Sequence, residues 1–112
     1  GIKPIIGMEA YIHNSEDIGD KTNRQRFHLC LYAKNDIGYK NLMFLSSQAY
    51  MHGFYYYPRI NKQLLRDNSE GLVCSAACLQ GEVNWHLNTQ SERNVKNGAK
   101  GYEEAKKNSF RI

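Results

Sequence analysis

Alternation of apolar and polar side chains over residues 27–34, followed directly by a helical pattern, is the feature that most constrains the fold of this chain. Every second side chain is apolar, and this period of two predicts a strand with one face against a core. The apolar positions are Phe27, Leu29, Leu31 and Ala33. Asn35 or Asp36 caps a predicted helix that Gly53 ends. A strand, a short loop and a helix in this order are typical of α/β proteins.

The remaining elements follow the same alternation of strands and helices. Sequence patterns predict, in order, a largely buried strand from Ile5 to Ile12, a polar loop over 13–25, one or two helical turns over 61–66, a strand over 72–74, and helices over 79–87 and 92–107. Three strands interleaved with helices predict an α/β unit whose strands pair in parallel.

The composition is that of a globular chain. Hydrophobic residues make up 41% and charged residues 23% of the 112 residues. No apolar run approaches the roughly 20 residues that a membrane-spanning helix needs, so we expect no membrane partner. The net charge of +4 weakly favours polyanions, but the basic residues are scattered. The three cysteines form no spaced disulfide framework, which predicts free thiols and a cytoplasmic location.

Three side chains have the chemistry of metal ligands. Glu9 lies on the first predicted strand, where a carboxylate needs a cation, hydrogen bonds or solvent. His28 and Cys78 lie near the same ends of the second and third strands if these run parallel, so all three side chains would converge at one edge of a sheet. Carboxylate, imidazole and thiolate together suit zinc or a similar transition metal. On spacing alone, a hydrogen-bonded histidine and a small buried cysteine are the more common explanation.

The other polar and aromatic candidates have structural interpretations. We interpret three histidines as solvated residues or local caps, the last of them also as part of helix packing. They are His13, His52 and His86. Glu82 lies in the first turn of a predicted helix, where the helix dipole favours an acid. The run 54–59 combines aromatic side chains with an arginine, as single-strand-binding proteins do, but packing of this loop onto the domain is the favoured interpretation.

Four blocks of the sequence resemble, in the same order, the PHP domains of bacterial replicative DNA polymerase III alpha subunits. The blocks are GIKPIIGMEAY at 1–11, Phe27-His28-Leu29 with Ala33-Lys34-Asn35 and Gly38-Tyr39-Asn41-Leu42, Gly53-Phe54-Tyr55-Tyr56 with Pro58-Arg59, and Ser75 to Val83 with Cys78-Leu79 and Gly81-Glu82-Val83. Their combination is far more specific than any one of them. It covers most of residues 1–107.

The resemblance implies a distorted seven-stranded β/α barrel that holds a cluster of divalent metals, namely zinc, manganese or magnesium. It assigns Glu9, His28 and Cys78 to metal-ligand positions and no catalytic residue to this chain. The upstream His-x-His and Asp-His ligands of the family and its downstream His and Asp-x-His ligands have no counterpart here. Because a metal cluster needs a complete, preorganised set of ligands, we expect weak or no metal binding by the chain itself.

The same resemblance predicts a partial domain. Residues 1–107 correspond to a PHP domain that lacks the N- and C-terminal parts of the barrel, and the chain opens on Gly1 in mid-domain. Residues 108–112 are either the start of the next strand or a cloning scar. A barrel cut open exposes strand edges, so we expect self-association.

The implied parent is a DNA-directed DNA polymerase of DNA replication, and the chain alone is predicted to be inactive. The implied partners are DNA, a proofreading exonuclease and a sliding clamp. Within that parent this domain has a structural role and, where its metal site is intact, hydrolyses phosphoesters. Two alternatives stay open: a docking scaffold for the exonuclease or the polymerase palm, and a stand-alone phosphoesterase of the PHP superfamily such as a histidinol phosphatase. The blocks at 53–59 and 78–83 favour the polymerase.

Overall fold

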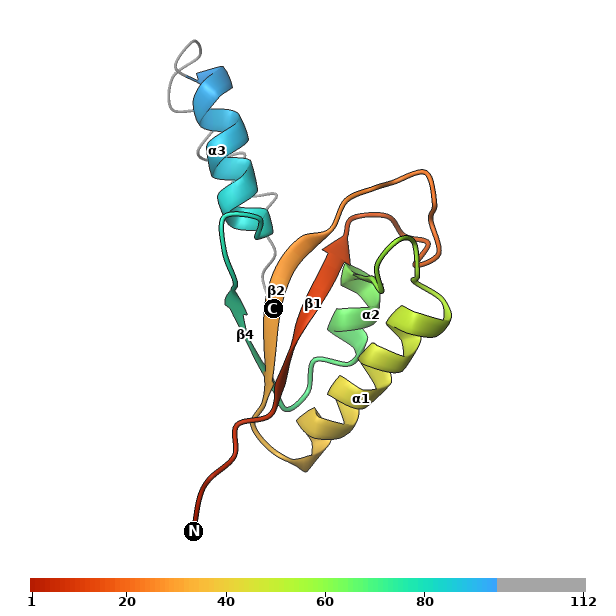
Figure 1. Cartoon of the computed structure of the whole chain (residues 1–112), viewed down its shortest axis with the longest axis vertical. Coiled ribbons are helices and arrows are strands. Elements are labelled where there is room, and N and C mark those ends of the chain that lie inside the picture. Colours follow the sequence, from red (N-terminus) through yellow and green to blue (C-terminus); the bar gives the residue numbers. More distant parts are fainter. Residues whose placement is uncertain (95–112) are drawn as a thin grey trace.

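Four strands and three helices form a mixed α/β fold in this computed structural model, which describes residues 1–94 (Figure 1). The strands are β1 (Gly7–His13), β2 (Phe27–Ala33), β3 (Ile60–Asn61) and β4 (Leu72–Ala76). The helices are α1 (Asp36–Met51), α2 (Lys62–Asp67) and α3 (Glu82–Asn94). The strands make one sheet in the order β3-β1-β2-β4. The mixture of strands and helices predicted from the sequence is confirmed.

The directions of the strands correct the predicted parallel pairing. β2 is antiparallel to both of its neighbours, β1 and β4, and the parallel contact in the described sheet is the short one between β1 and β3. β1, β3 and β4 therefore run in one direction, and β2 is reversed. The connection from β1 to β2 contains no helix to return the chain, so these strands pair antiparallel. Strand β3, which was not predicted, lies between α1 and α2 in the sequence. Helix α2 therefore connects β3 to β4, whereas the predicted order has no strand between the one over 27–34 and the one over 72–74.

The core lies between the sheet and helices α1 and α2, which cover one face of the sheet (Figure 1). All four strands contribute to it, and on β1, β2 and β4 every second side chain points toward it. The buried apolar residues are Ala10, Ile12, Leu31, Leu42, Leu45, Ala49, Ile60, Leu65 and Leu72. On β1, β2 and β4 the side chains of the opposite face stay partly or wholly exposed, apart from His13 at the end of β1.

Helix α1 begins where the sequence predicts. The Asn35 side-chain oxygen accepts a hydrogen bond from the Gly38 backbone N–H at 2.9 Å, so Asn35 is the cap. The helix ends at Met51, and Gly53 follows at a position without room for a side chain. A Cβ atom on Gly53 would lie 1.8 Å from the Arg59 carbonyl oxygen. This close approach brings residues 54–59 back alongside the end of α1.

Three local predictions are wrong in detail. Ile5 and Ile6 precede β1 and are 76% and 45% exposed. The Ala33 N–H donates to the Ile6 carbonyl, but β2 ends at Ala33 and does not continue alongside Ile5. β3 was not predicted as a strand. The helix predicted over 79–87 and the start of that predicted over 92–107 belong to one helix, α3, since the residues between them include no helix breaker.

Predictions that fall on residues 95–112, including both interpretations of 108–112, lie outside the described residues. Within the part of the chain that the structure describes, no helix has the length and apolar character that crossing a bilayer requires.

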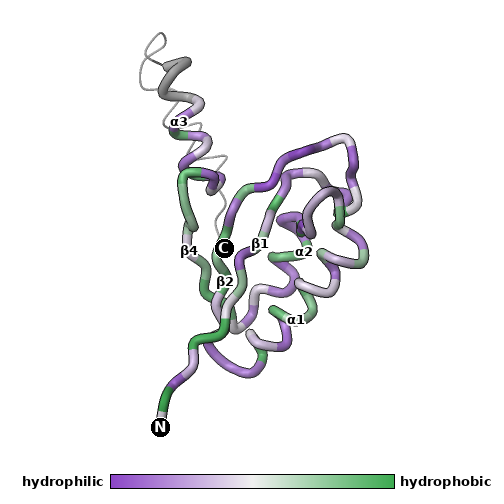
Figure 2. The backbone as a smooth tube through the Cα atoms, viewed as in Figure 1, coloured by the Kyte–Doolittle hydropathy of each residue, from purple (hydrophilic) through white to green (hydrophobic). Residues whose placement is uncertain are grey.

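The loop over 14–26 is hydrophilic and irregular, as predicted, yet it has a defined conformation (Figure 2). Arg59, which is 1% exposed, donates hydrogen bonds to the carbonyl oxygens of Asp20, Asn23 and Gln25. Buried carbonyl groups need partners, and one guanidinium supplies partners for three of them. The segment just before β3 therefore fixes the loop that follows β1.

His13 is the second buried polar residue at this loop. Of the two predicted roles, a solvated residue or a local cap, the first is wrong. His13 is 0% exposed. Its Nε2 donates to the Ile18 carbonyl at 3.2 Å, and its Nδ1 accepts from the Ser15 N–H at 3.3 Å. These bonds fit the neutral ring, because a second proton on Nδ1 would face the Ser15 N–H. Burial, followed by the charge of Arg59, lowers the pKa of His13 below its usual value.

We expect the chain to lose stability as the pH falls below the ordinary histidine pKa. The pKa of His13 is lower in the folded chain than in the unfolded one, so the unfolded state binds the proton first and is favoured as the pH falls from about 7 to about 5. Urea unfolding midpoints measured across this range check the expectation. His13→Gln should be less stable at neutral pH and show a flatter pH dependence. His52→Gln, at an exposed position, should keep the original pH dependence. Equal pH dependence in wild type and His13→Gln would refute the assignment.

Candidate metal centre

The predicted metal ligands of β1 and β2 lie on the face of the sheet that α1 and α2 do not cover. Glu9 pairs with Cys30, and Tyr11 pairs with His28, in the antiparallel register of β1 and β2. Paired residues and residues two apart on a strand point to the same face, so these four side chains share the face opposite the core. Their exposure is partial or complete, whereas the side chains between them are packed into the core.

A tight turn after β4 brings Cys78 to this face. The Gly81 N–H donates to the Cys78 carbonyl at 2.9 Å, and the Asn84 side chain donates to the same carbonyl at 2.9 Å. The His28 N–H donates to the Gln80 carbonyl at 3.2 Å, which ties this turn to the start of β2. His28 lies beside the turn because β2 begins where β4 ends. The two residues meet through antiparallel strands, and the predicted reason for their meeting, parallel strands, is wrong.

The sulfur of Cys78 lies 3.4 Å from Nδ1 of His28. The Gln80 N–H donates to the same sulfur at 3.3 Å. Zinc bonds to nitrogen and sulfur of about 2.0 and 2.3 Å, at a tetrahedral angle, place two donor atoms about 3.5 Å apart. The His28–Cys78 separation therefore fits two ligands of one ion, and it equally fits a thiol–imidazole hydrogen bond. Cys78 is exposed and His28 is half-buried, so an ion can approach this pair from solvent.

Glu9 is on the same face as this pair but one step away in the register. It is a diagonal neighbour of His28, and such neighbours across an antiparallel pair are about 7–8 Å apart. Among residues 1–94, no three histidine, cysteine, aspartate or glutamate side chains are grouped closely enough to ligate one ion. The structure thus brings His28 and Cys78 together and leaves Glu9 nearby. The use of all three as ligands stays a prediction.

Tyr11 and Arg26, which sequence reasoning did not single out, extend this face toward Tyr57. The Tyr11 ring lies 4.8 Å from the His28 ring and 5.4 Å from the Tyr57 ring, measured between centroids. Arg26 lies over Tyr57 with its guanidinium carbon 4.0 Å from the ring centroid. The alternation over 27–34 stops just short of Arg26, and Tyr11 is predicted as part of the first strand and of the block at 1–11, without a role in a site. The aromatic run at 54–59 was the available sequence signal for this neighbourhood.

Glu82 is buried, which its predicted place in the first turn of a helix did not indicate. It is 6% exposed, and its Oε1 lies 2.6 Å from Lys62 Nζ and 3.2 Å from the Asn14 amide nitrogen that donates to it. His86 Nε2 lies 3.6 Å from the same oxygen, and the His86 ring packs against Phe27. This arrangement joins the start of α3 to α2 and to the end of β1. Its role is structural, and the predicted packing role of His86 is confirmed.

Comparison with known proteins places the whole chain in one family. The model of the PHP domain matches residues 1–112. The chain belongs to the PHP family, whose domains generally bind metal ions.

Curated relatives of the chain are alpha subunits of DNA polymerase III. The chain is 76% identical over 106 residues to "DNA polymerase III subunit alpha" of Campylobacter jejuni, covering 95% of this chain and 9% of that protein. It is 70% identical over 107 residues to the same subunit of Helicobacter pylori strain 26695, covering 96% of this chain and 9% of that protein. For Treponema pallidum the identity is 42% over 105 residues, covering 91% and 9%. The chain therefore spans less than a tenth of the length of these relatives.

Proposed function

We propose that this chain acts as part of a replicative DNA polymerase III alpha subunit, a DNA-directed DNA polymerase, in which it contributes to the metal-binding PHP domain. The observation that carries the proposal is the His28–Cys78 pair, which lies at ligand spacing on an accessible face. The chain that holds this pair is 76% identical to such a subunit over 95% of the chain. The chain holds none of the paired-aspartate motifs that polymerisation uses. On its own it is expected to incorporate no nucleotide.

The donor atoms support a metal-dependent role for this domain. Imidazole and thiolate favour zinc over magnesium, and His28 with Cys78 would hold the ion while Glu9 supplies a carboxylate from the same face. A bound divalent ion there supplies a water of lowered pKa and neutralises phosphate charge, which is the chemistry of phosphoester hydrolysis. Affinity in the chain itself is expected to be weak, because two or three ligands do not make a complete site.

The open sheet supports a wider proposal about architecture. The ligand-bearing face would be the interior of a distorted seven-stranded β/α barrel, with residues 1–107 a part of it and α1 and α2 on its outside. β4 is an outer strand of the described sheet, and an outer strand can pair with a further strand or with a second chain, which supports the expected self-association. In the parent subunit the expected surroundings are DNA, the proofreading exonuclease and the sliding clamp, in the cytoplasm.

One alternative rests on the same observations. Because no complete ligand group occurs among residues 1–94, a docking scaffold for the exonuclease or the polymerase palm needs no metal chemistry from this chain. A stand-alone phosphoesterase is less well supported, since every relative described above is a polymerase subunit.

A chimeric polymerase tests the proposal. This chain would replace the matched segment of the Campylobacter jejuni subunit, and DNA synthesis on a primed template should persist because the replaced segment is 76% identical. In that chimera, His28→Gln and Cys78→Ser should each lower bound zinc at least about tenfold, since removing a ligand costs more than removing the groups that support one. Metal content measured by mass spectrometry, at equal protein concentration, gives the readout.

Two matched substitutions serve as controls. His52→Gln changes an exposed histidine, and Cys74→Ala changes a thiol on the core side of β4 whose burial raises its pKa. Both should leave the metal content unchanged. If His28→Gln and Cys78→Ser also leave it unchanged while synthesis is normal, the scaffold alternative holds. Loss of synthesis in the unsubstituted chimera would contradict the assignment to this subunit.

A further inference from the structure

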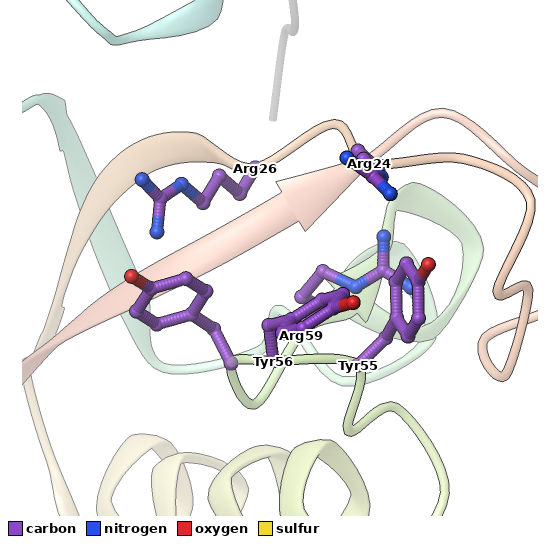
Figure 3. Close-up of a pocket in the computed structure, with 6 residues that line it drawn as sticks. Arg24, Arg26, Tyr55, Tyr56 and Arg59 are labelled. Atoms are coloured by element: carbon purple, nitrogen blue, oxygen red, sulfur yellow. The ribbon is translucent and has the colours of Figure 1, made fainter.

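Three arginines and three tyrosines line a pocket of about 330 Å³ beside the candidate metal centre (Figure 3). The lining residues are Arg24, Arg26, Tyr55, Tyr56, Tyr57 and Arg59. Two of the arginines come from the loop before β2, and the other residues come from the segment between α1 and β3. Figure 3 shows the two loop arginines facing the tyrosine segment across the opening. Among residues 1–94 no acidic side chain lines the pocket, so its described wall is both positively charged and aromatic.

The arginines are held by aromatic rings, and none of the ion pairs within residues 1–94 includes one of them. The Arg26 guanidinium carbon is 4.0 Å from the centroid of Tyr57 and 5.8 Å from that of Tyr11. Arg24 lies 6.0 Å from the centroid of Tyr56. A guanidinium that stacks on a ring keeps the N–H groups at its edge for anionic oxygens, and phosphate is the anion whose geometry this edge fits.

The backbone at Tyr56 presents an aromatic ring at the mouth of this pocket. Tyr56 has a φ of 60°, in the left-handed region that a bulky residue rarely adopts. The Tyr55 N–H donates to the Tyr57 carbonyl at 3.0 Å and closes this tight turn. Tyr56 is consequently 70% exposed and Tyr57 42% exposed. Packing onto the domain, the favoured interpretation of the sequence, does not explain a strained turn that keeps its rings exposed.

Arg59 adds a third positive charge to the pocket wall. Its terminal nitrogens bond the loop carbonyls, and its guanidinium carbon lies 5.3 Å from the centroid of the Tyr55 ring. The charge of Arg59 is therefore held in place beside the tyrosines.

We propose that this pocket binds a nucleotide of a single-stranded nucleic acid, with the base against Tyr56 and the phosphate at Arg24 and Arg26. Base–tyrosine stacking and arginine–phosphate contacts are the two means by which proteins hold single strands without reading their sequence. The volume is at the lower end of the range for ligand pockets, which suits one nucleotide unit. Tyr11 contacts both Tyr57 and His28 and so connects the pocket to the candidate metal centre. A role as the substrate subsite of that centre rests on the function proposed above, whereas the binding itself does not.

Fluorescence anisotropy of a labelled oligothymidylate about 12 nucleotides long, titrated with the full chain, tests the binding. Chelator in the buffer removes any contribution of metal, so that failure here and failure of the metal-centre proposal are separate results. Tyr56→Ala should weaken binding about tenfold, and Tyr56→Phe should leave it nearly unchanged because the stacking face remains. Arg26→Gln should weaken binding and reduce the slope of log affinity against log salt by about 0.7.

Matched controls use residues of the same type away from the pocket. Tyr39→Ala on α1 and Arg66→Gln on α2 change exposed side chains and should not alter the affinity. Circular dichroism and thermal unfolding confirm that each variant is folded. Equal losses from Arg26→Gln and Arg66→Gln would refute the pocket and leave general charge attraction as the cause. Equal losses from Tyr56→Ala and Tyr39→Ala would refute stacking of a base on Tyr56. Equally effective competition by polyglutamate would refute it in favour of an acidic peptide.

Discussion

Replacing Arg59 with methionine is expected to lower the free energy of unfolding by about 3–4 kcal/mol, because one buried side chain bonds three loop carbonyls. Methionine has a similar length and fills much of the same volume, so the loss reports on hydrogen bonding more than on packing. The three carbonyls of Asp20, Asn23 and Gln25 would have to find water or stay unpaired. Chemical denaturation followed by circular dichroism at neutral pH gives the measurement.

Two comparisons make this result interpretable. Arg66→Met, on the exposed surface of α2, should change the free energy of unfolding by less than about 0.5 kcal/mol. Arg59→Lys keeps the charge but lacks the fork of donors, so it should recover little of the loss. Full stability in Arg59→Lys would mean that charge, and not the pattern of hydrogen bonds, holds the loop.

The second large effect is expected at Glu82. Glu82→Leu should destabilise the chain by about 3 kcal/mol, because it removes the partner of Lys62 in a largely buried ion pair. The Lys62 side chain is 18% exposed, which places the effect at the lower end of the range for buried pairs. Thermal and urea unfolding of the variant measure the loss.

A double substitution separates the pair from its surroundings. Lys62→Met combined with Glu82→Leu removes both charges and should recover part of the stability that Glu82→Leu loses, since an apolar pair replaces a lysine whose ion pair with Glu82 is broken. The recovery is only partial because Glu82 also accepts a hydrogen bond from Asn14. If the losses of the two single variants simply add in the double variant, the two charges do not stabilise each other.

The sequence predicted most accurately the elements whose signals are local. Alternation over 27–34 and the cap at Asn35 define β2 and the start of α1 by interactions within a few residues, and both are confirmed. The direction of β2 was predicted wrongly because it depends on how distant strands arrange themselves. β3 has two residues, too few for any periodicity to show, and its omission led to the wrong partner for α2.

The sequence predicted which types of residue form the candidate site, but only part of their arrangement in space. His28 and Cys78 meet because the turn after β4 folds back to the start of β2, and no pattern in the sequence encodes that tertiary contact. Burial of Glu82 depends on tertiary structure, because its partners Lys62 and Asn14 are distant in the sequence, whereas the hydrogen-bond partners of the buried His13 are local. The three arginines of the pocket are spread over 36 positions, from Arg24 to Arg59. They are close together because Arg59 donates hydrogen bonds to the loop that carries Arg24 and Arg26.

The hydrogen bonds from Arg59 to the loop over 14–26 also determine when this part of the molecule can fold. Its hydrogen bonds join residues 34 to 39 positions apart in the sequence. Contacts of such long range need the intervening chain, including α1, to close a loop first, and closure of this kind slows folding. During synthesis, the segment after β1 therefore lacks these hydrogen bonds until Arg59 has left the ribosome. The pocket and the stabilised loop arise together as a late event, and a chain stopped before this residue would present β1 and β2 without either.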